Sequence, residues 1–194
     1  MLMDPLLLGT ASAFGLAAAT GLNSTLPLLL VGLAARFGLL TLAAPFDAVG
    51  SDVALVGLTV LALGEIAADK IPGADSIVHL VQGPVTLAAG AILFASQQSL
   101  VQDVSPGLAI LVGLLTAGGV HALRAAVRPV VTVATMGFGG PVVSAAEDAG
   151  AIGLTLAALA APLLAIVAAI ALIAVGGKLA IGRVTRRRQL ARAV

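Results

Sequence analysis

The chain has 194 residues, of which 60% are hydrophobic and only 10% are charged. A soluble domain carries about 45–50% apolar and about 25% charged residues. This composition therefore excludes an ordinary soluble domain and predicts an integral membrane protein. The absence of cysteine excludes disulfide bonds and thiolate metal sites.

The apolar segments predict an all-α polytopic transmembrane bundle of six or seven segments. Only the run 151–177 has the roughly 20 apolar residues that a membrane-spanning helix needs, with Pro162 as a tolerated kink. The other segments are shorter or interrupted by polar residues, Gly and Pro; they are 5–19, 27–45, 53–68, 77–95, 106–120 and 129–143. Such segments are typical of broken or re-entrant helices that line a polar interior. Ordinary Ala-rich spans with loosely defined ends are the alternative.

Helix starts are well marked in the sequence. Asp4 and Ser105 each precede a Pro and fit N-caps, because Pro at the first helical position loses no hydrogen bond. Ser144 and Glu147 have the spacing of a capping box and are predicted to open the last helix. That prediction gives Ser144 and Glu147 a purely structural role.

The cations are segregated toward the end of the chain. Six of the ten lie in the last 17 residues: Lys178, Arg183, Arg186, Arg187, Arg188 and Arg192. Cytoplasmic segments of membrane proteins are enriched in Lys and Arg. We therefore expect a single transmembrane helical domain, 1–176, followed by a basic cytoplasmic C-terminal tail, 177–194.

A zig-zag path through the membrane satisfies this charge distribution. It puts the junctions 20–25, 69–76 and 121–128 on the cytoplasmic side and the acidic loops on the outer side. It also puts Glu147 and Asp148 at the outer end of the last helix.

Three segments share a layout that indicates a weak internal repeat: an apolar helix, a polar junction, a Pro and a second helix of small residues. The prolines are Pro27, Pro84 and Pro129. Junctions on one side of the bundle would gather Asn23, Ser24, Thr25, Asp69, Lys70, Asp75, His79, Gln82, His121, Arg124 and Arg128 at one face. Helix N-termini near each Pro would favour an anion or a polar headgroup there. Chance similarity between Ala-rich helices is the alternative.

Ionisable residues within membrane segments are functional candidates by default. Glu65 is the deepest acid and lies one helical turn before Asp69, so the two carboxylates share a helix face. Asp69 and Lys70 could instead form a neutralised pair at the membrane interface. Arg36 lies within the segment 27–45 and needs a partner, for which Glu147 is the natural candidate.

A cationic stripe is the second candidate. His121, Arg124 and Arg128 are spaced i, i+3, i+7 and so follow one face of a helix. This stripe would face an anion or pair with Asp69 and Glu65. Alternatively, the two arginines extend to the cytoplasmic headgroups.

Other chemistries have little support in the sequence. The two histidines, His79 and His121, lack the spacing of metal ligands. The glycines of GFGGP do not match a dinucleotide fingerprint, and no Ser-His-Asp or Cys-His arrangement is found. We therefore expect no metal, no cofactor and no enzymatic activity. Ten cations without interleaved aromatic residues predict no nucleic-acid binding.

The blocks DKIPGADSIVHLVQGPVTLAAGAILFA, GLNSTLPLLLVGLAARFG, VHALRAAVRPVV and VVSAAEDAG resemble an uncharacterised bacterial membrane protein family, domain of unknown function 4126. The resemblance covers nearly the whole chain short of the basic tail, and the DKIP and S-x-x-E-D blocks are its most specific parts. In the family, Arg124 is often Lys and an Asn commonly follows the Arg-Pro pair, which this chain lacks. The resemblance implies a small all-helical protein of the bacterial cytoplasmic (inner) membrane. It implies no activity.

These observations favour a channel or carrier for a small ion or polar solute, acting as a homo-oligomer in the lipid bilayer. The alternative is a non-catalytic structural or accessory subunit of a larger membrane complex, because small-residue helix faces serve docking equally well. A protein that modifies or moves lipids is a third hypothesis. The predicted pathway residues are Glu65, Asp69, Lys70, His121, Arg124, Arg128, Asn23, Asp75 and His79.

Overall fold

The computed structural model describes residues 4–68, 75–97, 104–134 and 139–192, and within them the chain is helical throughout its regular structure. The helices are α1 (Pro5–Leu22), α2 (Leu26–Arg36), α3 (Asp52–Ala68), α4 (Asp75–Ala95), α6 (Pro106–Ala134), α7 (Gly140–Ala160) and α8 (Pro162–Arg192), with a short 3-10 helix, η1 (Phe46–Gly50). The only β pairing in the described residues is an isolated antiparallel bridge between Leu42 and Gln97. The predicted all-α bundle is confirmed.

Three of these helices are long and apolar enough to cross a membrane: α1, the part Pro106–Pro129 of α6, and α7. This finding is consistent with a membrane protein. Large apolar side chains are exposed over the outside of the bundle, as on α3, α6 and α8, where a bilayer would solvate them at no cost.

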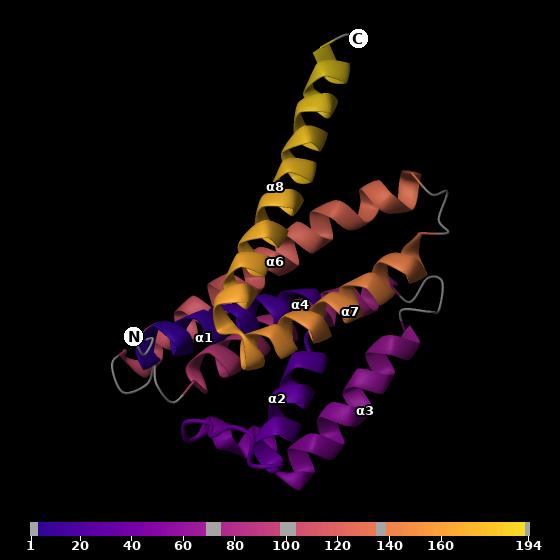
Figure 1. The fold of residues 1–194 in the computed structure, drawn as a ribbon. Coiled ribbons are helices and arrows are strands. Elements are labelled where there is room, and N and C mark those ends of the chain that lie inside the picture. The colour runs from indigo at the N-terminus through magenta and orange to yellow at the C-terminus, as the bar shows by residue number, and fades with distance from the viewer. Residues whose placement is uncertain (1–3, 69–74, 98–103, 135–138, 193–194) are drawn as a thin grey trace.

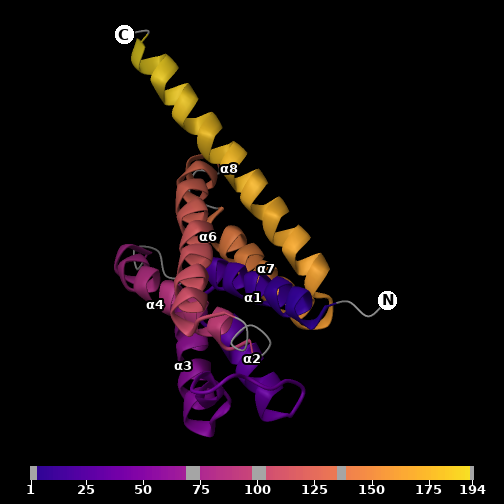
Figure 2. The ribbon, with the colours of Figure 1, turned by 90° about the vertical axis from the view of Figure 1, so that its left-hand side faces the viewer.

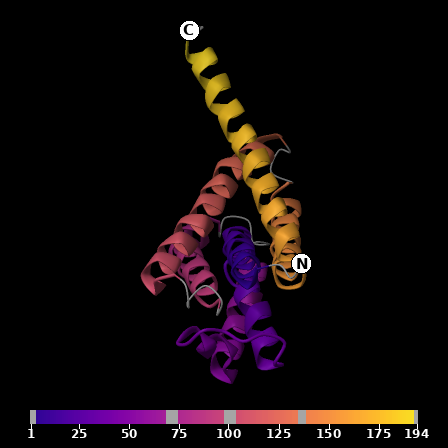
Figure 3. The same cartoon turned by 60° about the vertical axis from the view of Figure 1, so that its left-hand side comes forward.

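Helix α1 lies at the centre of the bundle. It packs against α4, α6, α7 and α8, and Figure 3 views it nearly end-on between these partners. All but one of the residues from Ala11 to Leu22 are buried. Most of them are Ala, Gly, Ser or Thr, so four neighbours can approach one helix closely.

Glycines set the closest helix crossings around α1. A methyl group on Gly15 would come within 2.9 Å of Ala158 on α7 and 2.8 Å of Ala165 on α8. Gly90 of α4 contacts Ala117 of α6, and a methyl group there would lie 3.0 Å from Thr20 Oγ1. These crossings admit no larger residue without a shift of the backbone.

The contacts along α1 also fix the helix directions. Gly15 lies against Ala158, whereas Leu22 lies near Gly150, so α1 and α7 are antiparallel. Helix α8 begins beside Gly15 in the middle of α1 and later passes Leu123 of α6, so it runs from the middle of α1 toward the second half of α6. The C-terminal end of α1 therefore lies near the first half of α7 and the second half of α6.

The segment from α2 to α3 forms a lobe beside this bundle (Figure 1 and Figure 2). Helix α2 has only 11 residues and ends at Arg36. The chain then turns at Gly38, whose φ of 71° suits glycine, and reaches the end of α4, where Ala43 N donates to Ser96 O at 2.8 Å. The predicted segment 27–45 is therefore not one helix with Arg36 inside it.

Two further boundary predictions are wrong. The run 151–177 is split at Ala161, where φ is −147°, so Pro162 begins α8 instead of kinking one span. Helix α6 continues without a break through the junction 121–128, with Pro129 inside it.

The predicted N-caps at Asp4 and Ser105 are confirmed. Leu6 N donates to Asp4 Oδ1 at 3.0 Å, and Leu108 N donates to Ser105 Oγ at 3.4 Å. The predicted capping box is wrong, because α7 begins at Gly140 and carries Ser144 and Glu147 inside it. The break predicted at GFGGP agrees with the end of α6 and the start of α7.

Helix α8 extends well past the rest of the bundle to Arg192 (Figure 1). The predicted basic tail is therefore helical in its described part, as a continuation of α8. The division between a membrane domain and a tail stays a prediction.

Candidate functional site

The chain between α1 and α2 is a helix break made of three buried polar residues. Asn23, Ser24 and Thr25 expose only 6%, 2% and 2% of their surfaces. Asn23 Oδ1 accepts from the backbone N–H groups of Thr25 at 3.0 Å and Leu26 at 2.9 Å. Asn23 thus supplies the side-chain oxygen that the start of α2 needs, because Thr25 itself makes no capping bond.

Asn23 also ties the break to α7. Its Nδ2 donates to Asp148 Oδ1 at 2.8 Å. One amide side chain therefore uses its oxygen to cap α2 and its nitrogen to bind a carboxylate. This double role fixes both the orientation of the amide and the distance between the break and α7.

Two arginines of α6 meet one carboxylate of α7. Arg128 Nη2 lies 2.6 Å from Glu147 Oε2, and Arg128 Nε donates to both carboxylate oxygens, at 3.3 and 3.2 Å. Arg124 Nε lies 2.8 Å from Glu147 Oε2. Its angle does not meet the geometry of a hydrogen bond, so Arg124 contributes mainly as a neighbouring charge.

This three-residue ion cluster is well shielded. The side chains of Arg124, Arg128 and Glu147 expose 6%, 17% and 12% of their surfaces. Removing charges from water costs several kcal/mol for each ion, and contacts of this quality are what offset that cost.

Glu65, in the last turn of α3, is held at the helix break. Ser24 Oγ donates to Glu65 Oε1 at 2.6 Å, a short bond typical of a charged acceptor. Glu65 Oε2 is shielded from solvent and has no hydrogen-bond partner in the structure. The carboxylate is thus half-satisfied.

Gln82 and His121 continue the polar region between α4 and α6. Gln82 is buried, and its Oε1 has no hydrogen-bond partner in the structure. A methyl group on neighbouring Gly83 would lie 3.9 Å from His121 Nε2. His121 lies one helical turn before Arg124, so both belong to the same face of α6.

These side chains lie toward the same end of the bundle, and we call them together the polar layer. It extends from α3 through the α1–α2 break to α7, α6 and α4, and its members are Asn23, Ser24, Glu65, Gln82, His121, Arg124, Arg128, Glu147 and Asp148. The layer lies where α1 ends, so it crosses one end of an otherwise apolar bundle.

The structure brings together five of the predicted pathway residues: Asn23, Glu65, His121, Arg124 and Arg128. Asp69 and Lys70 lie outside the described residues. Asp75 and His79 lie in the first turns of α4, and their side chains are outside the described part. Their roles stay predictions.

Two acids of the polar layer were misplaced by the sequence reasoning. Glu147 and Asp148 do not lie at the end of the bundle opposite the 121–128 stretch. Glu147 binds Arg124 and Arg128, and Asp148 binds Asn23. The error follows from counting 129–143 as a separate membrane segment, whereas α6 continues to Ala134 and α7 begins at Gly140.

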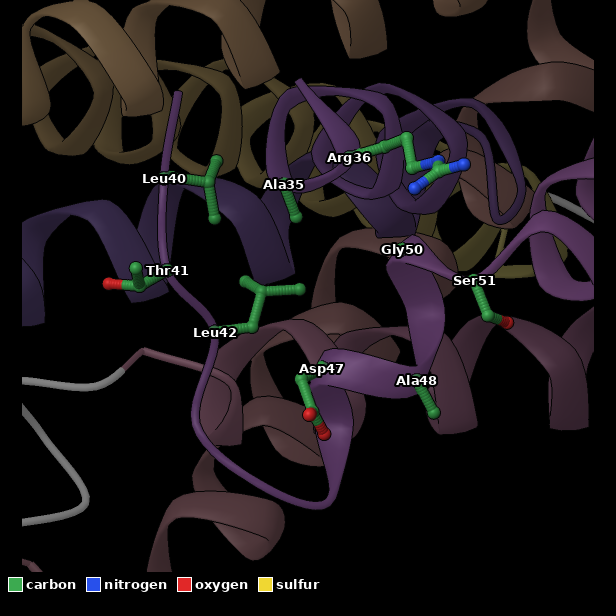
Figure 4. A pocket seen from close by; sticks show the side chains of 9 residues that line it. All are labelled: Ala35, Arg36, Leu40, Thr41, Leu42, Asp47, Ala48, Gly50 and Ser51. Carbon is green, nitrogen blue, oxygen red and sulfur yellow. The ribbon is translucent and has the colours of Figure 1, made fainter. Parts of the chain in front are cut away.

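The predicted partnership of Arg36 with Glu147 is also wrong. Arg36 Nη2 lies 3.0 Å from Asp52 Oδ1 at the start of α3, and both side chains are largely exposed. Arg36 and Asp47 line an open pocket of about 570 Å³ between α2 and η1, in which Figure 4 shows their side chains directed apart. This pocket has no connection with the polar layer.

An apolar groove of about 600 Å³ lies between α6 and α8, with α1 as its floor. Its lining includes Phe14, Leu115, Val120 and Ile170, and Thr116 is its main polar residue. In the described residues, no group of three or more His, Asp or Glu side chains has the arrangement of a metal site.

Apolar helices of spanning length, close packing through small residues and a buried charged layer together define a small helical protein of membrane type. The chain belongs to the family described as a domain of unknown function (DUF4126), whose model matches residues 10–180. The resemblance seen in the sequence is thereby confirmed. Searches of curated proteins and of solved structures found no significant match.

Proposed function

We propose that this protein is a channel or carrier for a small ion or polar solute, with its site in the polar layer at the α1–α2 break. The observation that carries the proposal is the placement of five ionisable side chains within an apolar bundle: Glu65, Arg124, Arg128, Glu147 and Asp148. Charged groups in membrane segments are costly, and they mark solute or ion pathways. A purely structural bundle of Ala- and Gly-rich helices would gain more from apolar residues at these positions.

The broken helix supports the same proposal. At a break, the partial negative end of α1 and the partial positive end of α2 meet in the interior. Discontinuous helices of this kind form the solute sites of many secondary transporters. Here the break carries Ser24 and Asn23, which bind the carboxylates of Glu65 and Asp148.

The orientation we propose follows from the basic residues of α8. Helix α8 passes Leu123 of α6 at Gly176, so its basic end continues on the side of the bundle that carries the polar layer. Cytoplasmic ends are enriched in cations. The polar layer would then lie toward the cytoplasmic side of a bacterial inner membrane, and Asp4 would lie on the outer side.

A flux assay in liposomes tests the proposal. The purified protein is reconstituted and assayed against a panel of cations, anions and small polar solutes. We expect flux of at least one solute and at least a tenfold loss in Glu65→Gln or Arg128→Gln, corresponding to about 1.4 kcal/mol. Asp52→Asn, in an exposed ion pair outside the layer, is the matched control and keeps native flux.

Two results would remove this proposal: no flux of any solute, or unchanged flux in both polar-layer variants. Size-exclusion profiles of the variants show whether a loss of flux comes from loss of the fold.

The second candidate function is an accessory subunit of a larger membrane complex. It is favoured by α3, which exposes Val53, Val56, Val60 and Leu63 and on which Gly57 has no neighbour within 4 Å. Pull-down from native membranes separates the two functions. A stoichiometric partner supports the accessory role, whereas self-association alone supports the predicted homo-oligomer.

A further inference from the structure

We propose that Glu65 and Ser24 bind a single monovalent cation, either a proton or an alkali-metal ion, and that this is the ion moved by or coupled to transport. The inference rests on the proposed function for its role, whereas the binding site itself is argued from the side chains.

The first argument is the unequal environment of the two carboxylate oxygens of Glu65. Oε1 accepts a 2.6 Å hydrogen bond from Ser24. Oε2 is shielded from solvent and has no partner in the structure. A desolvated anionic oxygen without a hydrogen-bond partner destabilises the folded protein. A bound proton or cation removes that destabilisation.

The second argument compares Glu65 with the other carboxylates of the polar layer. Glu147 receives two guanidinium groups, and Asp148 receives the amide of Asn23. Among the described residues, Glu65 receives one neutral hydroxyl, that of Ser24. It is therefore the carboxylate in the described polar layer with the least compensation.

The third argument concerns the charged residues on the elements that pack against α3, the helix that carries Glu65. Helix α3 packs against α2, η1 and α4. Arg36 of α2 is paired with Asp52, which lies 13 residues and so about 20 Å before Glu65 along the helix axis. Asp47 of η1 lines the pocket near Arg36. The acid and the histidine at the start of α4, Asp75 and His79, have side chains outside the described part.

The positive and negative charges of the described polar layer are also unequal in number. It contains three carboxylates and two guanidinium groups, and a neutral His121 leaves a net charge of −1. One bound monovalent cation brings the layer to neutrality. A divalent cation would leave the layer with a net charge of +1, and an anion would make its net charge more negative.

Each form of the cation has defined chemistry at this site. A proton adds to Oε2 and turns the carboxylate into a neutral acid, with the Ser24 bond to Oε1 retained. An alkali-metal ion would be bound by Oε2 together with oxygen atoms at the end of α1, where a helix leaves backbone carbonyl groups without intrahelical partners. Neither form needs a redox step or a covalent intermediate.

Binding is measured on the full-length protein in lipid nanodiscs, without transport. Protons are probed by infrared spectroscopy, which detects the carbonyl band of a protonated carboxylic acid between about pH 4 and about pH 9. Alkali-metal ions are probed by melting temperature in NaCl, LiCl or KCl against choline chloride. We expect either a pH-dependent acid band or a rise in Tm of about 3–6 °C at roughly ten times Kd.

Four variants assign the signal to Glu65. We expect the binding signal to be absent in Glu65→Gln. We expect it to be retained in Glu65→Asp and in the exposed control Asp52→Asn. Ser24→Ala keeps the carboxylate but removes the hydrogen bond that stabilises its charged form, and we expect about tenfold tighter binding. The acid band identifies a proton as the ligand, and the salt-dependent Tm identifies an alkali-metal ion.

The inference is wrong if native protein gives neither signal, or if Glu65→Gln leaves the signal unchanged. Failure here is distinct from failure of the proposed function. Flux without a Glu65 signal removes the cation site and leaves transport in place. A Glu65 signal without flux of any solute removes transport and leaves the cation site.

Discussion

Replacing Glu147 by Gln tests whether the ion cluster holds α6 against α7. The substitution keeps the size of the side chain but removes the charge that faces Arg124 and Arg128, which are 6% and 17% exposed. Both guanidinium groups are then left in a shielded site with a neutral amide as their neighbour. Removing one partner of a buried ion pair exposes the full desolvation cost of the other.

The expected loss in unfolding free energy is about 2–4 kcal/mol. Side-chain hydrogen bonds within membrane proteins average about 0.6 kcal/mol and reach about 1.7 kcal/mol, so two lost contacts give a lower bound of roughly 1 kcal/mol. Breaking a buried pair in a soluble protein costs about 3–5 kcal/mol. Glu147 lies between these limits, because both Arg124 and Arg128 contact its carboxylate.

The assay is unfolding of the purified protein in mixed micelles by a denaturing detergent, followed by helical circular dichroism. Asp52→Asn is the matched control, since its ion pair with Arg36 is exposed and should contribute under about 1 kcal/mol. The double variant Arg128→Gln/Glu147→Gln should be about 1–3 kcal/mol less destabilised than the sum of its single variants. A Glu147→Gln protein within about 0.5 kcal/mol of Asp52→Asn would refute the assignment of a stabilising role to the cluster.

Two further predictions concern close packing and the helix break. Gly90→Ala should cost about 1–3 kcal/mol in the same unfolding assay, because the added methyl group overlaps Ala117; Gly57→Ala, where nothing lies within 4 Å, should be neutral or stabilising by up to about 1 kcal/mol. Equal effects of the two glycine changes would contradict the packing described. Asn23→Asp keeps the cap of α2 but sets a carboxylate against Asp148, so we expect about 1–3 kcal/mol of destabilisation that Asp148→Asn relieves. An unrelieved loss would show that the contact with Asp148 is not the cause.

The fold was predictable from the sequence where a local signal determines it. An acid or hydroxyl residue followed by Pro located the starts of α1 and α6, because capping depends on neighbours in sequence. The division between α7 and α8 was not predictable in this way. Pro162 fits both a kink and a helix start, and only the packing of Ala158 and Ala165 around Gly15 distinguishes the two.

The sequence predicted the site residues that come from α3, α6 and the end of α1, but it missed those that come from α7. Spacing alone put Arg124 and Arg128 on one face, because both lie on one helix. Their partner Glu147 is 19 residues from Arg128, and its position depends on where α7 starts and on its antiparallel direction. Two acids six and seven residues after the Pro of a helix-starting GGP would have indicated an interior position.

The central position of α1 has a consequence for how the protein is made. During synthesis this helix leaves the ribosome before α4, α6, α7 and α8, the four helices that later enclose it. Its surface of small residues, suited to those neighbours, offers lipid little dispersion contact in the meantime. Biogenesis therefore has to keep an early helix competent for docking until the last partner, α8, arrives.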